Sequence, residues 1–145
     1  MQTATLQRQI ATRHDLTAIH YKDWEAIYHP TGVVVTRHPF DNIYGGVSHG
    51  DIYIVTGEHR VWISNRNQTV SGSADEKYPY FLENIRESVV GIADVIIFTL
   101  DGGGMQEGAV KWLQRACYEL GIETNTECFV FTPKQTMQFL NRRLR

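Results

Sequence analysis

The sequence predicts a three-layer α/β domain with a mixed (α+β) sheet, in which N-terminal antiparallel hairpins are followed by a helix and a βαβ unit. Residues 95–98 form a continuous apolar run, which is typical of a central strand covered on both faces. A helical pattern over residues 105–120 and a second apolar strand at 128–131 follow it. This order indicates a right-handed crossover between parallel strands.

The N-terminal third is less regular. We expect residues 1–145 to form a single domain, because this length and a hydrophobic content of 42% suit one core. Residues 1–14 predict a polar N-terminal helix or arm. The stretch 15–28 fits either a helix or a strand, and we favour two strands, at 24–28 and 33–37, with a turn between them.

The middle of the chain contains a hairpin and a polar connection. Residues 51–55 and 60–64 alternate on either side of a Thr-Gly-Glu turn, which predicts an antiparallel pair whose register stays open. The following segment, residues 65–77, is polar and turn-rich around its Ser-Gly-Ser centre at 71–73. We expect it to be a lid or a linker.

Three helices follow from apolar periodicity and capping residues. The first covers residues 80–92, with a proline near its start. The second, over 105–120, is expected to end at Gly121. The third covers residues 133–145, because Thr132 suits the N-cap and a proline suits the first helical position.

Residues 38–50 predict a long loop, because they contain three glycines and a proline and show little periodicity. Long loops on a rigid sheet are often functional. His49 is a candidate proton carrier in catalysis, since imidazole titrates near neutral pH, and His38 and Tyr44 are candidate ligand contacts. A purely structural, hydrogen-bonded role is the alternative for each histidine.

A glycine-rich loop connects the central strand to the helix after it. Gly102, Gly103 and Gly104 let the backbone approach a ligand, and the start of the helix favours an anion. Ligands bind at the carboxyl ends of parallel strands, so Asp101 and Glu107 are candidate catalytic carboxylates. Alternatively, the glycines form only a tight turn and Glu107 is a favourable first-turn acid.

From residue 33 onward the order of elements resembles the ribonuclease H-like fold. That resemblance implies clustered acids that hold two metal ions, on the first strand, the first helix and the end of the fourth strand. Glu83 and Asp101 match the last two positions, whereas the strand 33–37 has no aspartate.

Residues 80–132 resemble nucleoside deoxyribosyltransferase-like proteins. The shared features are a helix, a strand of the type Ala-Asp-Val-Ile-Ile, a loop and a second helix. The resemblance implies that Glu107 is a carboxylate nucleophile that attacks a ribosyl carbon.

Together these patterns predict a small cytosolic enzyme that acts on a nucleotide or nucleoside, as a hydrolase or a glycosyl-bond-cleaving enzyme. The alternative is a non-enzymatic oligomeric protein that sequesters a nucleotide signal or blocks a protein partner. We expect a homo-oligomer. A net charge of −2 argues against nucleic acid, and the chain has no apolar run long enough for a membrane span. The cofactor stays unknown: a divalent metal is open, although no metal-binding motif is present.

Overall fold

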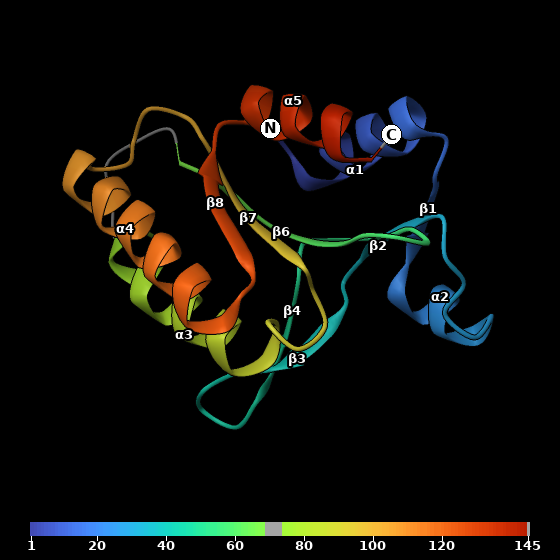
Figure 1. Ribbon diagram of the computed structural model, residues 1–145, viewed down its shortest axis with the longest axis horizontal. Helices are drawn as coiled ribbons and strands as arrows, with labels where there is room; N and C mark the ends of the chain where they lie inside the picture. Colours follow the sequence, from blue (N-terminus) through green and yellow to red (C-terminus); the bar gives the residue numbers. More distant parts are fainter. Residues whose placement is uncertain (69–73, 145) are drawn as a thin grey trace.

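The computed structural model describes residues 1–68 and 74–144, and a six-stranded mixed sheet lies at its centre (Figure 1). The strand order is β1-β2-β5-β6-β7-β8. β5 is antiparallel to both of its neighbours, whereas the other neighbouring pairs are parallel. The strands are β1 (Thr17–His20), β2 (Val33–Thr36), β5 (Ile52–Val55), β6 (Arg60–Asn67), β7 (Val95–Asp101) and β8 (Glu127–Phe131).

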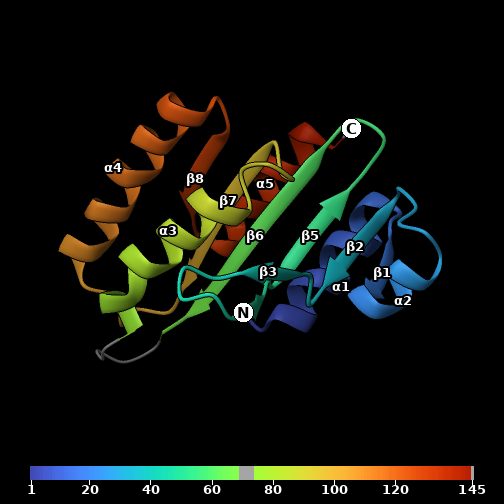
Figure 2. The same cartoon turned by 90° about the horizontal axis from the view of Figure 1, so that it is seen from below.

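Helices cover both faces of this sheet, which confirms the predicted mixed α/β class (Figures 1 and 2). α1 and α5 pack on one face, and α3 and α4 pack on the other. α2 lies beside the edge strand β1. The helices are α1 (Thr3–His14), α2 (Tyr21–Ala26), α3 (Tyr78–Ser88), α4 (Glu107–Thr124) and α5 (Pro133–Arg143), with a short 3₁₀ helix η1 (Ala74–Lys77) before α3. No helix among the described residues has the length and hydropathy needed to cross a bilayer.

Side-chain alternation along β6 builds both halves of the core. Val61 and Ile63 point to the α1/α5 face, whereas Trp62 points to the α3/α4 face. Towards its C-terminal end β6 becomes polar, yet Ser64 and Asn65 remain buried. Polar side chains therefore project from this end of the strand on both faces of the sheet.

The C-terminal half of the fold follows the sequence closely. β7, α4 and β8 form the predicted parallel unit, in which Val95 pairs with Glu127. α5 begins as predicted: Thr132 accepts a hydrogen bond from the Gln135 N–H, and the Gln135 side chain accepts one from the Thr132 N–H. The helix predicted over residues 80–92 is α3, which starts two residues earlier and ends at Ser88.

The strand predicted at residues 24–28 is wrong, because these residues lie in α2 and the turn after it. The ring of His20 accepts a hydrogen bond from the Lys22 N–H and so caps the helix. Trp24 is buried, and its indole N–H donates to the carbonyl of Pro30 at 2.9 Å. This contact links α2 to the residues just after it. The short apolar alternation at residues 24–28 does not indicate such a helix.

Two further boundaries differ from the prediction. Gly121 does not end α4, which continues to Thr124 and is capped by Asn125 in the left-handed conformation. β6 extends to Asn67, so the start of the segment expected to be a lid or linker is a strand. The Ser-Gly-Ser centre of that segment, residues 71–73, lies outside the described residues.

The loop predicted at residues 38–50 contains a second, two-stranded sheet, formed by β3 (Pro39–Asp41) and β4 (Val47–His49). Asn42 organises the turn between them, because its side-chain oxygen accepts hydrogen bonds from the N–H groups of Tyr44 and Gly46. Such Asx turns depend on one side chain rather than on periodicity. The hairpin β3–β4 was therefore missed.

Gly50 connects this hairpin to β5 and provides a test of the packing. A Cβ atom at Gly50 would lie 2.2 Å from the ring of Trp62, which is only 2% exposed. We expect Gly50→Ala to lower the free energy of unfolding by about 2 kcal/mol, because the buried ring has to shift. Urea unfolding followed by tryptophan fluorescence measures this change.

Gly57→Ala is the matched control, since a Cβ atom there meets no atom within 4 Å. It should change the stability by less than about 0.5 kcal/mol. Equal effects of the two substitutions would contradict the packing around Trp62.

Candidate functional site

Asp51 and Arg66 lie at one end of the β5–β6 hairpin. Asp51 directly precedes β5, and Arg66 is the penultimate residue of β6. The register pairs Ile52 with Ile63, which brings Asp51 beside Ser64. Since residues two apart in a strand share a face, Ser64 and Arg66 both project from the face that α3 covers.

These residues line a cavity of about 40 Å³. His49 and Gly50 border it from the hairpin side, and Phe81 and Asn84 border it from α3. A space of this size has room for one to a few water molecules. The cavity is thus a small chamber between the sheet and α3, lined by both polar and aromatic side chains.

Burial and charge act in opposite directions on the two ionisable groups. Desolvation raises the pKa of Asp51, and the charge of Arg66 partly offsets this rise. The N–H of Asn65 also favours the carboxylate, donating to Asp51 Oδ2 at 2.8 Å. Desolvation lowers the pKa of Arg66, and Asp51 opposes that shift in turn. The two charges therefore stabilise each other in a partly buried setting.

The guanidinium of Arg66 has spare hydrogen-bonding capacity. It stacks on the ring of Phe81, with Cζ 3.7 Å from the ring centroid. Its Nε is buried and has no hydrogen-bond partner among the described residues. A buried donor without an acceptor costs stability, so a ligand oxygen at this position would be stabilising.

The three predicted site residues of the 38–50 segment lie in different settings. His49 lines the cavity beside Asp51. His38 packs edge-on against Tyr53 and Trp62, and burial lowers its pKa. Tyr44 lies at the tip of the hairpin β3–β4 and is 81% exposed.

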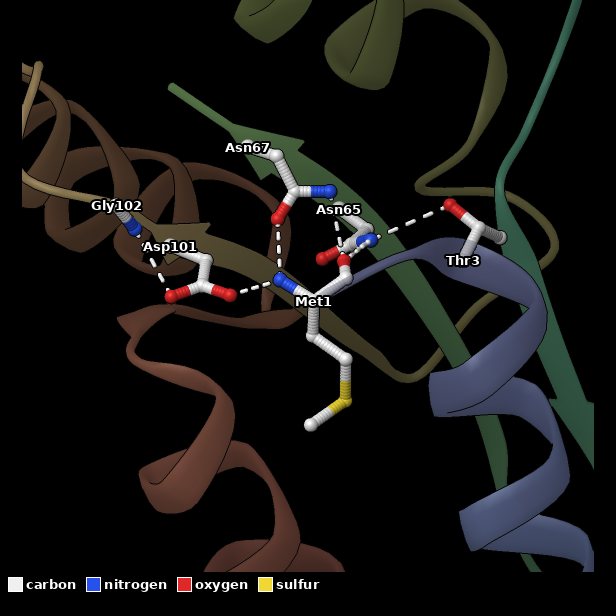
Figure 3. Close-up of polar contacts among 6 residues, drawn as sticks. All are labelled: Met1, Thr3, Asn65, Asn67, Asp101 and Gly102. Atoms are coloured by element: carbon white, nitrogen blue, oxygen red, sulfur yellow. Dashed lines mark hydrogen bonds and ion pairs between the residues drawn. The ribbon is translucent and has the colours of Figure 1, made fainter. Parts of the chain in front are cut away.

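Asp101 lies on the other face of the sheet, at the end of β7 (Figure 3). Its carboxylate pairs with the amino group of Met1 and accepts a hydrogen bond from the Gly102 N–H at 2.9 Å. The side-chain amides of Asn65 and Asn67 donate to the carbonyl oxygen of Met1. This network ties the residues before α1 to β6 and β7.

The rest of the glycine-rich loop makes local contacts. Gly104 exchanges two hydrogen bonds with Gln68: its N–H donates to the Gln68 carbonyl at 2.8 Å, and its carbonyl accepts from the Gln68 side chain at 3.0 Å. Gly102 has a φ of +90°, whereas a Cβ atom at Gly103 would meet open space. Glu107 is exposed and forms an ion pair with Lys111 one helical turn later.

The structure therefore does not bring the predicted catalytic residues together. Asp101 lies on the α1/α5 face and His49 borders the cavity on the α3 face, while Glu107 projects from the start of α4. The sequence analysis did not predict Arg66 and Ser64 as site residues. The signal that could have indicated them is their two-residue spacing on a strand, opposite Asp51.

A family model of the PD-(D/E)XK nuclease superfamily domain matches residues 2–143. The chain belongs to this superfamily. No curated protein and no solved structure matches the chain. Membership indicates a nuclease-type function, which agrees with the predicted nucleotide-directed hydrolase only at a coarse level. The expectations that nucleic acid is not a partner and that the chain forms a homo-oligomer receive no support from it.

The name of the superfamily describes a sequence motif that consists of a Pro-Asp pair and an (Asp/Glu)-X-Lys triplet. The sequence of this chain differs from that motif. It has no Pro-Asp pair, and its one literal triplet, residues 75–77, lies in η1 rather than on a strand. On a strand, that triplet's spacing would place an acid and a lysine on the same face. On β6, Ser64 and Arg66 have the same two-residue spacing and lie on the face beside Asp51, but neither is an acid or a lysine.

The residues around Asp51 do not fit a divalent metal ion. Phosphodiester hydrolysis often uses such ions, which require several oxygen ligands. Asp51 is the only carboxylate among the described residues that line the cavity. Ser64, Asn84 and His49 add a hydroxyl, an amide and an imidazole, and the positive charge of Arg66 lies close by. Across residues 1–68 and 74–144 no three acidic, histidine or cysteine side chains gather as a metal site.

The raised pKa of Asp51 predicts a pH-dependent difference between the wild type and Asp51→Asn. The pKa of Asp51 is higher in the folded state than in the unfolded state. At pH values in the window between these two pKa values, the folded state therefore binds more protons at Asp51 than the unfolded state does. The free energy of unfolding of the wild type therefore falls as the pH rises through that window, from about pH 4 upward. Asparagine does not titrate, so the stability of Asp51→Asn does not fall in this way, and the variant gains stability relative to the wild type over the same pH range.

Urea unfolding at several pH values measures this difference. Ser64→Ala is the control, since it alters the same cavity without removing a titratable group. A difference between Asp51→Asn and the wild type that stays constant with pH would contradict the raised pKa.

Proposed function

We propose that the chain is a nucleic-acid-directed phosphodiester hydrolase whose site consists of Asp51, Ser64, Arg66 and His49. The observation that supports it most is the juxtaposition of a partly buried carboxylate with a guanidinium whose Nε has no hydrogen-bond partner in the described part of the chain. Membership of a nuclease superfamily supports the substrate class. The sequence predicts an enzyme that acts on a nucleotide or nucleoside, and the proposal specifies the substrate as a nucleic acid and the reaction as phosphodiester hydrolysis.

Each group has a role that suits its surroundings. Arg66 holds the phosphate oxygens, because a guanidinium keeps its charge and donates in a planar fork. Asp51 is the general base, since a raised pKa makes its carboxylate a stronger proton acceptor. The cavity holds the attacking water, and the phosphodiester lies over its rim.

The proton and bond changes then balance. The water oxygen attacks phosphorus while its proton passes to the Asp51 carboxylate. The bond from phosphorus to the leaving ester oxygen breaks, and the imidazolium form of His49 donates a proton to that oxygen. The Ser64 hydroxyl donates a hydrogen bond to a non-bridging oxygen as charge develops on it.

A second candidate is binding without hydrolysis, as in the sequestering protein that the sequence left open. The observation that favours it is that Ser64 and Arg66, on β6 beside Asp51, add a hydroxyl and a cation to the site but no second acid. A cytoplasmic location and a homo-oligomer stay predictions.

Cleavage of labelled single-stranded and duplex DNA and RNA tests the proposal, with Mg²⁺ and with EDTA. We expect Asp51→Asn to slow cleavage by about 100-fold or more, because it removes the general base. Asp94→Asn is the control, since Asp94 pairs with Arg60 at the other end of β6. It should cleave at the wild-type rate.

Three outcomes would contradict parts of the proposal. Cleavage that depends on Asp101 but not on Asp51 would move the active site to the other face of the sheet. Cleavage lost in EDTA would contradict a site without metal. Substrate that is bound and recovered intact would favour the second candidate.

A further inference from the structure

Tyr44 is an exposed aromatic side chain that the proposed hydrolysis does not use. It is 81% exposed at the tip of the hairpin β3–β4, and its ring stacks on that of Tyr80 in α3. The two centroids lie 5.2 Å apart and the planes differ by 17°. One face of the Tyr44 ring thus contacts Tyr80, and most of the side chain remains open to solvent.

A line of ring contacts connects this pair to the proposed site. The ring of Tyr80 contacts that of Phe81, with centroids 6.0 Å apart. The guanidinium of Arg66 lies on Phe81, 3.7 Å from its centroid. The exposed ring and the cation proposed to hold phosphate therefore lie at two ends of one aromatic run.

The hairpin holds Tyr44 in place before any ligand binds. Asn42 accepts a hydrogen bond from the Tyr44 N–H at 3.0 Å, and Asn84 in α3 accepts one from the Ile43 N–H at 2.9 Å. The hydroxyl of Ser88 donates to the carbonyl of Asp41. With its backbone held by these hydrogen bonds and its ring stacked on that of Tyr80, Tyr44 has less conformational freedom to lose on binding.

Stacked, fixed aromatic rings beside a phosphate-binding cation suit one class of ligand. Bases in a duplex already stack on both faces, whereas an unpaired base can place its flat face on an exposed ring. Protein sites for single strands combine such rings with cationic groups that contact the backbone. Tyr28, at 91% exposure, is more accessible than Tyr44 but follows α2 beside the edge strand β1. Among residues 1–68 and 74–144, no aromatic ring stacks on it.

We propose that Tyr44, supported by Tyr80, is a stacking platform for an unpaired base of a single-stranded nucleic acid whose backbone phosphate reaches Arg66. The proposal rests on the proposed function for the role of Arg66, and it adds the form of the substrate. The platform makes single strands, or unpaired ends, the preferred ligand over duplexes.

Fluorescence anisotropy in EDTA measures binding without turnover. The probes are a labelled single-stranded DNA, the RNA of the same sequence, and a blunt DNA duplex. We expect the wild type to bind single strands more tightly than the duplex. Tyr44→Ala should weaken single-strand binding by about tenfold, because it removes one stacking contact. Duplex binding should change less than about twofold, since paired bases do not use the platform.

Two variants separate stacking from other effects. Tyr44→Trp keeps a flat ring and should retain wild-type affinity for single strands. Tyr28→Ala removes another highly exposed tyrosine, away from the hairpin β3–β4, and should leave the affinity for single strands unchanged. Circular dichroism of Tyr44→Ala shows whether the hairpin variant keeps the fold.

The proposal is overturned if the duplex binds as tightly as the single strands, if no probe binds, or if Tyr44→Ala binds single strands like the wild type. Its failure is distinguishable from that of the proposed function. If cleavage requires Asp51 but Tyr44→Ala binds single strands normally, the hydrolytic role stands and only the stacking platform is contradicted. If Tyr44→Ala loses single-strand binding but Asp51→Asn cleaves like the wild type, the stacking platform stands and only the hydrolytic role of Asp51 is contradicted.

Discussion

The two-residue alternation of side chains along β6 is the constraint on which the rest of the structure depends. It sends Trp62, Ser64 and Arg66 to the α3/α4 face, and Val61, Ile63, Asn65 and Asn67 to the α1/α5 face. A shift of one residue in its register would exchange these sets and place Arg66 among the residues that anchor α1. The antiparallel pairing with β5 and the parallel pairing with β7 fix this register over the whole strand.

Placing Asp51 and Arg66 in a confined space costs free energy of desolvation, and the opposite shifts in their pKa values report that cost. A well-packed apolar pair at the same positions would often be at least as stable. The buried Nε of Arg66 adds to the cost, because it lacks an acceptor among the described residues. Perturbed groups that border a cavity are typical of functional sites, where such a cost is offset by binding or chemistry.

The sequence was sufficient where apolar periodicity determines the structure. The β7-α4-β8 unit and the capping of α5 follow from spacing and from Thr132, and both are present. It was insufficient where one polar contact decides, as with the indole of Trp24 in α2 and the amide of Asn42 in the hairpin β3–β4. The candidate site belongs to the second kind, because bringing Ser64 and Arg66 to Asp51 requires the register of the β5–β6 hairpin. Periodicity alone left that register open.

Asn65 connects the two polar regions at this end of the sheet. Its backbone N–H donates to Asp51. Its side chain donates to the carbonyl of Met1 and to the hydroxyl of Thr3 (Figure 3). Since backbone and side chain act on different groups, a substitution at Asn65 removes the contacts to the residues before α1 but keeps the N–H for Asp51. The anchoring of α1 and the carboxylate of the candidate site therefore share one residue while using separate atoms of it. This separation lets β6 support a buried charge on one face without weakening the attachment of a helix on the other.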